Sequence, residues 1–482
     1  MKQKLYKCLM LLIALPTLYG CYGIRPSRGG AEAKTSERKI NPMDISLPTG
    51  YSIEAVASDL TFPTGIAFDG NGLMYVVESG YAYGETWTQP HLLKIESSAK
   101  ASVVATGSEN GPWNGVAFYE GQFYVSEGGE RDGGKILRIS KEGEVTTLIE
   151  NLPSMGDHHT NGPIVMNGYV YFGQGTVTNS GIVGEDNAKF GWLKRHPDFH
   201  DIPCSDIVLN GKNYKTDNPL TDDPDDKANT GAYVPFNTTT HEGQIIKGSL
   251  PCSGSLMKIP LEGGEPELVA WGFRNPYGMA AQNDKLFVVE NGFDDRGSRP
   301  VWGTGDILWE VKENQWYGWP DYSGHEPLDH HGYKVPGKGT AELLLKDHPS
   351  EPPKPVAVLG VHSSSNGLDF STSEVFGFNG KAFIAQLGDM APNVGKVLGP
   401  VGFKVVMVDV ELGIVKDFAL NKGNKNGPAS QLKKGGLERP IAVKFHPDGK
   451  SLYVVDFGII DTSGKGTVSR KGTGVVWKIT KQ

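Results

Sequence analysis

Four short polar stretches each stand directly before an apolar run, and they carry the side chains best suited to chemistry. A neutral histidine is a natural general base for an alcohol proton, because its unperturbed pKa is about 6.5. We assign that role to His159, three residues before Gly162. The alternative is that the histidines only bond backbone carbonyls. The four stretches are Trp113-Asn114-Gly115, Asp157-His158-His159-Thr160-Asn161-Gly162, Arg274-Asn275-Pro276 and Glu438-Arg439-Pro440.

Two of these stretches contain an arginine. Guanidinium groups bind carboxylates through parallel hydrogen bonds and stack on planar rings. Arg274 and Arg439, if both are directed at one point, therefore indicate an anionic and planar ligand. Pro276 stiffens the chain beside Arg274 and Asn275, which favours a fixed polar pair at the start of a strand. The simpler alternative is that Arg274 caps a turn and pairs with a surface carboxylate.

A further polar turn offers oxygen ligands for a metal ion. Glu290-Asn291-Gly292-Phe293 supplies backbone carbonyls, and Asp294, Asp295 and Asp306 follow it. Calcium takes six to eight oxygen ligands of these kinds. The spacing is not that of an EF-hand, and the acids could instead pair with Arg296 and Arg299.

These segments need a framework that brings them together, and an internal repeat supplies one. Each copy is a short apolar stretch, a turn of Gly, Asn or Asp, and a second apolar or aromatic stretch, which predicts a β-hairpin. Most copies are followed by a further strand-like run of the Leu-x-x-Ile type. The six copies span 63–78, 115–127, 162–173, 277–290, 367–385 and 440–456.

Three to four strands per unit are typical of a propeller blade. Because each sheet has an apolar face that only its neighbour can cover, we predict an all-β fold, a six-bladed β-propeller over residues 48–482. The final strand near Val475 is expected to pair with the strand at 51–56 and close the ring. Loops that enter the hairpins would then converge near the axis, where the four polar stretches would form one site.

The interval 176–254 breaks the repeat and is rich in acidic residues and turn formers. It contains Cys204 and Cys252, the cysteines left once Cys8 and Cys21 are assigned to an N-terminal signal. In an exported chain such a pair is expected to form a disulfide, with two free thiols as the alternative. We therefore predict a long loop insertion on one face, pinned by a disulfide and covering the central funnel.

The N-terminus resembles a bacterial lipoprotein signal. Lysines precede a short apolar run, and Gly20 stands directly before Cys21. The run is too short to span a bilayer. We predict a signal peptide at 1–20, an acylated Cys21 and a flexible tether at 21–47. The chain would be exported and lipid-anchored to a bacterial membrane, facing the periplasm or the cell surface; an ordinary signal peptide cut nearby is the alternative.

The composition narrows the fold and the partners. With 64 glycines, 31 prolines and 10% aromatic residues, the chain favours many short strands joined by turns. The formal net charge is −8, and no stripe dense in Lys and Arg stands out. A nucleic-acid partner is therefore not expected.

From about Gly50 to the C-terminus, apart from the insertion, the sequence resembles the soluble glucose/sorbosone dehydrogenase family. These are quinoproteins that carry pyrroloquinoline quinone (PQQ) on a six-bladed propeller. The resemblance implies a PQQ-dependent oxidoreductase that oxidises a sugar, an aldose or a sorbosone-like substrate, with PQQ and calcium as cofactors. The motifs that carry it are His159-x-x-Gly162, Arg274-Asn275-Pro276-x-Gly278, Glu290-Asn291-Gly292 and Tyr317-Gly318-Trp319-Pro320.

The resemblance also implies residue roles. His159 would be the general base while hydride passes to the quinone, which calcium and Arg274 activate. The calcium ligands would be the carbonyls of Gly292 and Phe293, and we add Asp306 from the same region. The cofactor-binding residues would be Asn114, Asp157, Arg274, Asn275, Lys396 and Arg439.

Some positions depart from the family's pattern. Asn114 stands where a glutamine is expected, and only Arg439 stands where an arginine pair is expected. Asp157 is separated from His159 by a second histidine, and the loop around Lys396 differs in length.

The sequence contains no Cys-x-x-Cys-His haem-attachment motif, so electrons would pass to an external acceptor, a cytochrome or a quinone. Two other functions fit the same fold. One is a calcium-dependent lactonase-type propeller, which would not need two arginines at a planar ligand. The other is a non-catalytic, lipid-tethered propeller that binds a sugar or a protein.

Overall fold

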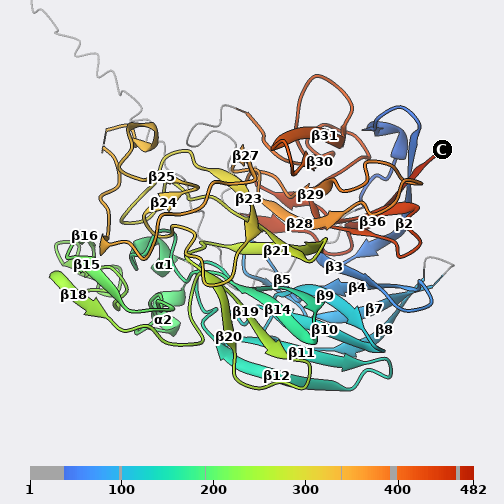
Figure 1. Cartoon of the computed structure of the whole chain (residues 1–482). Helices are drawn as coiled ribbons and strands as arrows, with labels where there is room; N and C mark the ends of the chain where they lie inside the picture. Colours follow the sequence, from blue (N-terminus) through green and yellow to red (C-terminus); the bar gives the residue numbers. More distant parts are fainter. Residues whose placement is uncertain (1–36, 97–99, 190, 338, 391–398, 463–466) are drawn as a thin grey trace, which may run out of the picture.

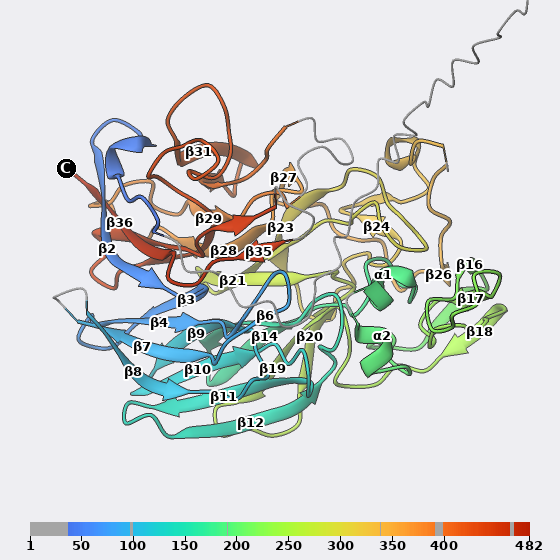
Figure 2. The ribbon, with the colours of Figure 1, turned by 180° about the vertical axis from the view of Figure 1, so that it is seen from behind.

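A computed structural model of the chain describes residues 37–96, 100–189, 191–337, 339–390, 399–462 and 467–482. Over these residues, six antiparallel sheets of four or five strands form what we number blades 1 to 6 in chain order. The sheets follow one another around the molecule, so that the N-terminal strand β2 lies beside the C-terminal strand β36 (Figures 1 and 2). The predicted six-bladed β-propeller is confirmed.

The first strand of each blade is its inner strand, and the hairpin that it begins is the unit of the sequence repeat. Blade 1 contains β3 (Pro63–Phe68), β4 (Met74–Glu78), β7 (His91–Ile95) and β8 (Ala101–Thr106). Blade 2 contains β9 (Trp113–Tyr119), β10 (Gln122–Glu127), β11 (Gly134–Ser140) and β12 (Val145–Leu152). Blade 3 contains β13 (Thr160–Met166), β14 (Tyr169–Gln174), β19 (Ser255–Pro260) and β20 (Glu267–Trp271).

The second half of the ring repeats this order. Blade 4 contains β21 (Pro276–Gln282), β22 (Lys285–Glu290), β23 (Gly305–Val311) and β27 (Ala357–Val361). Blade 5 contains β28 (Ser365–Phe370), β29 (Ala382–Gln386), β30 (Lys404–Asp409), β31 (Ile414–Asn421) and β1 (Ile45–Ser46). Blade 6 contains β32 (Pro440–Phe445), β33 (Ser451–Asp456), β36 (Gly474–Lys481) and β2 (Tyr51–Leu60).

The repeated glycine of the hairpins lies where neighbouring inner strands meet. A Cβ on Gly115 of β9 would stand 2.0 Å from the carbonyl oxygen of Gly162 in β13. A Cβ on Gly278 of β21 would stand 1.9 Å from the carbonyl oxygen of Asn366 in β28. Only glycine permits so close a backbone approach. The repeat therefore sets the inner strands side by side, with their starts on one face of the ring.

The ring closes through strands from opposite ends of the chain. In blade 6, β36 pairs with β2 in a register that joins Tyr51 to Lys481 and Leu60 to Gly474, as the sequence predicted. Between blades 5 and 6, Trp477 packs in a buried cluster with Phe383 and other apolar side chains. Burial of these clusters between blades is what stabilises the closed ring.

The predicted insertion leaves blade 3 between β14 and β19. Figures 1 and 2 show its helices and strands, drawn in green, on one side of the ring. Its first part reaches the site described below, whereas its strands extend outward, where β15 (Ile207–Asn210) pairs with β26 (Leu345–Asp347), so only part of it covers the ring. Its elements are α1 (Glu185–Lys189), α2 (Trp192–Arg195), β15 (Ile207–Asn210), β16 (Asn213–Asp217), β17 (Lys227–Gly231) and β18 (Glu242–Ile246).

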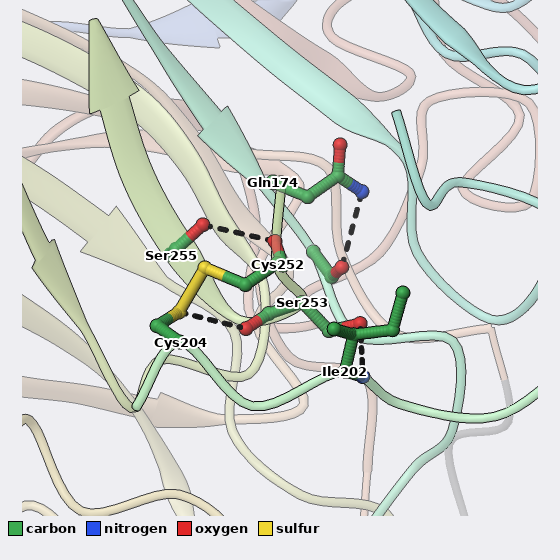
Figure 3. Close-up of a disulfide and its surroundings, with 7 residues drawn as sticks. Gln174, Ile202, Cys204, Cys252, Ser253 and Ser255 are labelled. Atoms are coloured by element: carbon green, nitrogen blue, oxygen red, sulfur yellow. Dashed lines mark hydrogen bonds between the residues drawn. A yellow bond between two sulfur atoms is a disulfide. The ribbon is translucent and has the colours of Figure 1, made fainter. Parts of the chain in front are cut away.

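The predicted disulfide is present. Cys204 and Cys252 are joined at 2.08 Å, and the side chain of Ser255 donates a hydrogen bond to the Cys252 carbonyl (Figure 3). The bond ties the start of the strand segment back to the end of the insertion. Free thiols at these positions are thereby excluded.

Short strands and 3-10 helices lie in the segments outside the blade strands. They are η1 (Pro42–Asp44), β5 (Tyr81–Ala82), β6 (Thr86–Trp87), β24 (Tyr322–Ser323), β25 (Glu326–Pro327), η2 (His331–Tyr333), β34 (Ile460–Asp461) and β35 (Val468–Ser469). Within the described part of the chain, no helix is long and apolar enough to cross a membrane. The predicted signal peptide, Cys21 and most of the tether lie outside the described residues.

Asp201 gives the insertion a testable pH dependence. Its carboxylate is 1% exposed and accepts hydrogen bonds from Val177 N, at 2.8 Å, and from the Thr178 hydroxyl. Burial raises its pKa to about 7. Because this value lies above the unfolded one, the stability that Asp201 contributes is full below about pH 4 and is lost as pH rises toward 7.

We therefore expect Asp201→Asn to weaken the pH dependence of stability. Between pH 5 and pH 8 the wild-type protein should lose about 2–3 kcal/mol more unfolding free energy than the variant. Urea unfolding at both pH values measures this difference. Asp206→Asn is the control, because Asp206 lies in the same insertion but is exposed. Equal losses in wild type and Asp201→Asn would refute the assignment.

Candidate active site

A chain of asparagine amides links the starts of the inner strands. Asn114 donates to the side-chain oxygen of Asn161 at 3.1 Å, and Asn161 donates to that of Asn275 at 2.9 Å. Asn275 in turn donates to the side-chain oxygen of Asn291 at 2.8 Å, and Asn291 donates to the Ser365 carbonyl at 2.8 Å. The chain crosses from blade 2 to blade 5. It fixes three of the four predicted polar stretches relative to one another, although it leaves few amide donors for a ligand.

Arg274 is held beside this chain by the insertion and by the 290–294 turn. The side chain is 3% exposed. Its Nε donates to the Asn179 carbonyl at 3.0 Å, its Nη1 donates to the Gly292 carbonyl at 2.7 Å, and its Nη2 lies 3.0 Å from Asp294 Oδ2. The predicted alternative of a surface turn cap does not describe this buried position. Arg274 instead links the insertion, through Asn179, to the turn of blade 4 that contains Gly292.

A second arginine, which the sequence analysis did not select, completes a charged cluster. Arg296 contacts the carboxylates of Asp157, Asp186 and Asp294. Burial opposes its charge, but these three carboxylates hold the pKa of Arg296 well above its ordinary value. Burial likewise opposes ionisation of Asp294, yet Arg274 and Arg296 hold the pKa of that carboxyl well below its usual range. Two guanidinium groups therefore pair with three carboxylates where blades 3 and 4 begin, which leaves one carboxylate in excess of the arginines.

The adjacent histidines His158 and His159 have different surroundings. Nδ1 of His158 lies 2.9 Å from the Thr176 carbonyl, and Nε2 lies 3.7 Å from Asp157. Burial, together with the charge of Arg274, lowers the pKa of His158 to about 3. A proton taken up by His158 would therefore be held poorly near neutral pH.

His159 lies against an acid from the neighbouring blade. Its Nε2 is 2.9 Å from Oε2 of Glu130, which stands in the loop between β10 and β11. Glu130 is completely buried and also accepts hydrogen bonds from Trp192 and Arg195 of α2. Asp157, the acid nearest in sequence, contacts Arg296 and His158 instead. Sequence reasoning missed Glu130. The signal that could have found it is that Glu130 lies in the loop after the second strand of its blade.

Arg439 is a buried cation without a carboxylate partner among the described residues. It is 1% exposed, and its Nη1 donates to the carbonyls of Leu387, at 3.3 Å, and Gly388, at 3.1 Å. Its Nε has no hydrogen-bond partner in the described part of the chain. Burial lowers its pKa to about 10. A buried donor left unpaired is costly, so this position suits an anionic ligand.

Tyr83 lies at the tip of the β5–β6 hairpin, and the residue as a whole is 48% exposed. The Ser469 hydroxyl donates to its carbonyl at 2.7 Å. Burial of the phenol end raises the pKa of Tyr83, and the charges of Arg439 and Arg296 oppose that rise.

The carbonyl oxygens of the predicted calcium turn keep lone pairs that a cation could use. From the described residues, the Gly292 carbonyl accepts one hydrogen bond, from Arg274, and the Phe293 carbonyl accepts one from Thr304 at 3.3 Å. A carbonyl oxygen has two lone pairs, so each retains one. Asp306 accepts hydrogen bonds from Gly292 N, the Ser363 hydroxyl and Ser365 N, and so it shapes the turn.

The described residues contain no group of three or more His, Cys, Asp or Glu side chains that could hold a metal ion. A cation at the 290–294 turn would therefore depend on backbone carbonyls and solvent. Lys396, predicted to bind the cofactor, lies outside the described residues.

No family model matches this chain, and no curated protein matches it significantly. Its fold, however, is shared by solved structures. The PQQ-bound aldose sugar dehydrogenase from Streptomyces coelicolor is 16% identical, with a TM-score of 0.51, over 90% of this chain and 99% of its own. The apo soluble aldose sugar dehydrogenase from Escherichia coli is also 16% identical, with a TM-score of 0.51, over 90% of this chain and 100% of its own.

A calcium structure of a Trichoderma reesei carbohydrate-active enzyme is 14% identical, with a TM-score of 0.52. That match covers 93% of this chain and 100% of the other. At these identities the likeness establishes a common fold. The fold expected from the sequence resemblance is thus confirmed, and the chemistry has to be argued from the site.

Proposed function

We propose that this chain is a PQQ-dependent oxidoreductase that oxidises a sugar, an aldose or a sorbosone-like substrate. The observation that carries the proposal is the buried Arg439, whose Nε lacks a partner among the described residues, on the face where the inner strands begin. PQQ is a planar quinone with carboxylate groups, and such a carboxylate would accept a hydrogen bond from Arg439 and balance its charge. The solved aldose sugar dehydrogenases of the same fold support the same assignment.

When bound, PQQ supplies the hydride acceptor. The chain supplies position and proton transfer. Arg439 and the remaining Nη1 proton of Arg274 would bind the ligand's oxygens, and the amide of Asn275 would border it. His159 would take the proton of the substrate hydroxyl, because its neighbour Glu130 can balance the positive charge that results.

His159 is preferred to His158 on electrostatic grounds. The pKa of His158 is lowered to about 3 by burial and by Arg274, so it would remain neutral and donate to Thr176. His159 instead has a carboxylate 2.9 Å away. A base that must hold a proton during turnover is better placed beside that carboxylate.

We place calcium at the carbonyls of Gly292 and Phe293, with Asp306 fixing the turn. The retained lone pairs of these carbonyls support this position, and the calcium structure of a protein with the same fold supports calcium as the ion. We further propose that an external cytochrome or quinone accepts the electrons. We also propose, from the lipobox-like signal, that the protein is lipid-anchored to a bacterial membrane and faces the periplasm or the cell surface.

The proposed anion contact predicts that Arg439→Gln weakens PQQ binding. Glutamine keeps donors to the nearby carbonyls but removes the positive charge. Charge-assisted hydrogen bonds contribute about 1.5–3 kcal/mol, so the Kd should rise about 10- to 100-fold. Titration of PQQ followed by absorbance measures it, with the exposed Arg131→Gln as control. An unchanged Kd in Arg439→Gln would remove Arg439 from the site.

A further inference from the structure

We propose that Glu130 positions His159 so that Nδ1, and not Nε2, is the nitrogen that accepts the substrate proton. This inference rests on the proposed function, because it concerns the same base. It assigns a role in positioning the base to Glu130, an acid of blade 2, and to the insertion that contacts it. The argument depends on which nitrogen of His159 carries hydrogen.

Hydrogen bonding fixes that tautomer. Oε2 of Glu130 lies 2.9 Å from Nε2 of His159, and Glu130 is completely buried. The other two partners of Glu130, the Trp192 indole and the Arg195 guanidinium, can only donate, and both donate to Oε1. A carboxylate can only accept, so Nε2 of His159 must carry the hydrogen and the neutral ring has its lone pair on Nδ1. Nδ1 makes no hydrogen bond within the described residues, and the side chain is 17% exposed.

Glu130 is held in place independently of the histidine. Its loop turns at Gly129, which has a φ of 77° and where a Cβ would stand 2.0 Å from the Gly133 carbonyl carbon. The side-chain oxygen of Asn110 accepts hydrogen bonds from Arg131 N, at 3.2 Å, and from Asp132 N, at 2.8 Å. The carboxylate is therefore fixed before any ligand arrives.

The insertion supplies the remaining partners of Glu130. Trp192 donates through its indole nitrogen, and Arg195 donates to the same oxygen at 2.8 Å. Both residues belong to α2. Without α2, Glu130 would keep one hydrogen-bond partner and a buried, poorly compensated charge. The insertion thus helps to orient the proposed base, His159, in addition to covering part of the ring.

The proposed proton transfer is simple. The O–H bond of the substrate breaks, its proton joins Nδ1, and the imidazolium that forms donates its other hydrogen to Glu130. The electron pair of the oxidised carbon leaves as hydride to the acceptor that the proposed function supplies. Tyr81 borders the ring, with centroids 6.1 Å apart, and its hydroxyl donates to Glu85 at 2.9 Å. Tyr81 therefore donates to Glu85 rather than to the base.

The tautomer is measurable without cofactor or turnover. In protein labelled with 15N-histidine, the His159 signals, identified by their loss in His159→Gln, should show a protonated Nε2 and an unprotonated Nδ1. In Glu130→Gln, Trp192 and Arg195 will claim the amide oxygen, so the amide nitrogen must face Nε2. The ring should then switch to the Nδ1–H form. A wild-type ring with hydrogen on Nδ1 would overturn the inference by itself.

Turnover of the reconstituted enzyme gives the second readout. The kcat of Glu130→Gln should fall by about 10²- to 10⁴-fold with little change in KM, because the base presents the wrong tautomer. Glu130→Asp, which keeps the charge, should recover part of that loss. A Glu130→Gln enzyme with the wild-type tautomer and kcat would contradict the role of Glu130.

Glu78→Gln is the matched control. Glu78 is a largely buried glutamate of blade 1 and, like Glu130, it lies beside a histidine, with its Oε2 3.3 Å from Nδ1 of His91. It has no contact with His159 among the described residues, so its replacement should leave the His159 tautomer unchanged. If it shifts the tautomer as Glu130→Gln does, the effect is a general disturbance of the blades. Absence of PQQ binding with the expected tautomers would refute the proposed function while leaving the positioning intact.

Discussion

Replacing His159 with glutamine is expected to lower kcat for sugar oxidation by about 10²- to 10⁴-fold, the usual contribution of a general base. Glutamine can keep a hydrogen bond to Glu130 but cannot accept a proton. The Kd for PQQ should stay close to that of the wild type, because the proposed anion contacts lie on Arg439 and Arg274. Dye reduction with saturating sugar, together with a PQQ titration, separates these two effects.

His158→Gln is the comparison that makes this result specific. His158 donates to the Thr176 carbonyl, and glutamine can replace that bond. We expect a much smaller loss of kcat than in His159→Gln. If His158→Gln loses more activity than His159→Gln, the base has been assigned to the wrong histidine, and the argument from the lowered pKa of His158 fails.

The second large effect is expected at Arg274. Replacing it with methionine leaves the carboxylate of Asp294 with fewer partners, the Gly292 carbonyl without its donor, and the Asn179 carbonyl with only Trp319 Nε1 at 3.4 Å. Breaking a buried ion pair costs about 3–5 kcal/mol, so urea unfolding should show a loss of that size. PQQ binding should be lost as well, because the insertion and the calcium turn both depend on this side chain.

Two further variants separate binding from stability. Arg299→Met breaks another fully buried pair, with Asp321 at 2.8 Å, so it should cost similar stability while PQQ still binds. Arg274→Lys keeps the charge but loses the planar fork, so it should retain more stability than Arg274→Met and still bind PQQ weakly. Wild-type PQQ affinity in Arg274→Lys would show that the guanidinium fork does not contact the cofactor.

The fold was predictable because the same sequence pattern of glycine and turn residues recurs in each blade. Glycines such as Gly115 and Gly278 recur where inner strands touch, and turn residues recur between the two strands of each hairpin. Pairing of the strand near Val475 with the N-terminal strand followed from the same repeat. The disulfide between Cys204 and Cys252 was predictable because these are the two cysteines that remain outside the expected signal segment.

The site was predictable only in part. Residues at the starts of inner strands, such as Asn114, Asn275 and Arg274, were found because the fold directs those positions to the axis. Glu130 and Arg296 were missed, since they lie in loops that leave the second strand of a blade, where the repeat imposes no spacing. The structure of the insertion, which brings α2 to Glu130, depends on contacts between distant segments that no local pattern records.

The central claim is tested most directly by reconstituting the exported chain, without its signal segment, with PQQ and calcium and following dye reduction across a panel of aldoses. We predict saturable PQQ binding and sugar-dependent reduction that requires PQQ. A chain that binds no PQQ at micromolar cofactor, or that binds it and reduces no dye with any sugar, would contradict the assignment as a sugar-oxidising quinoprotein.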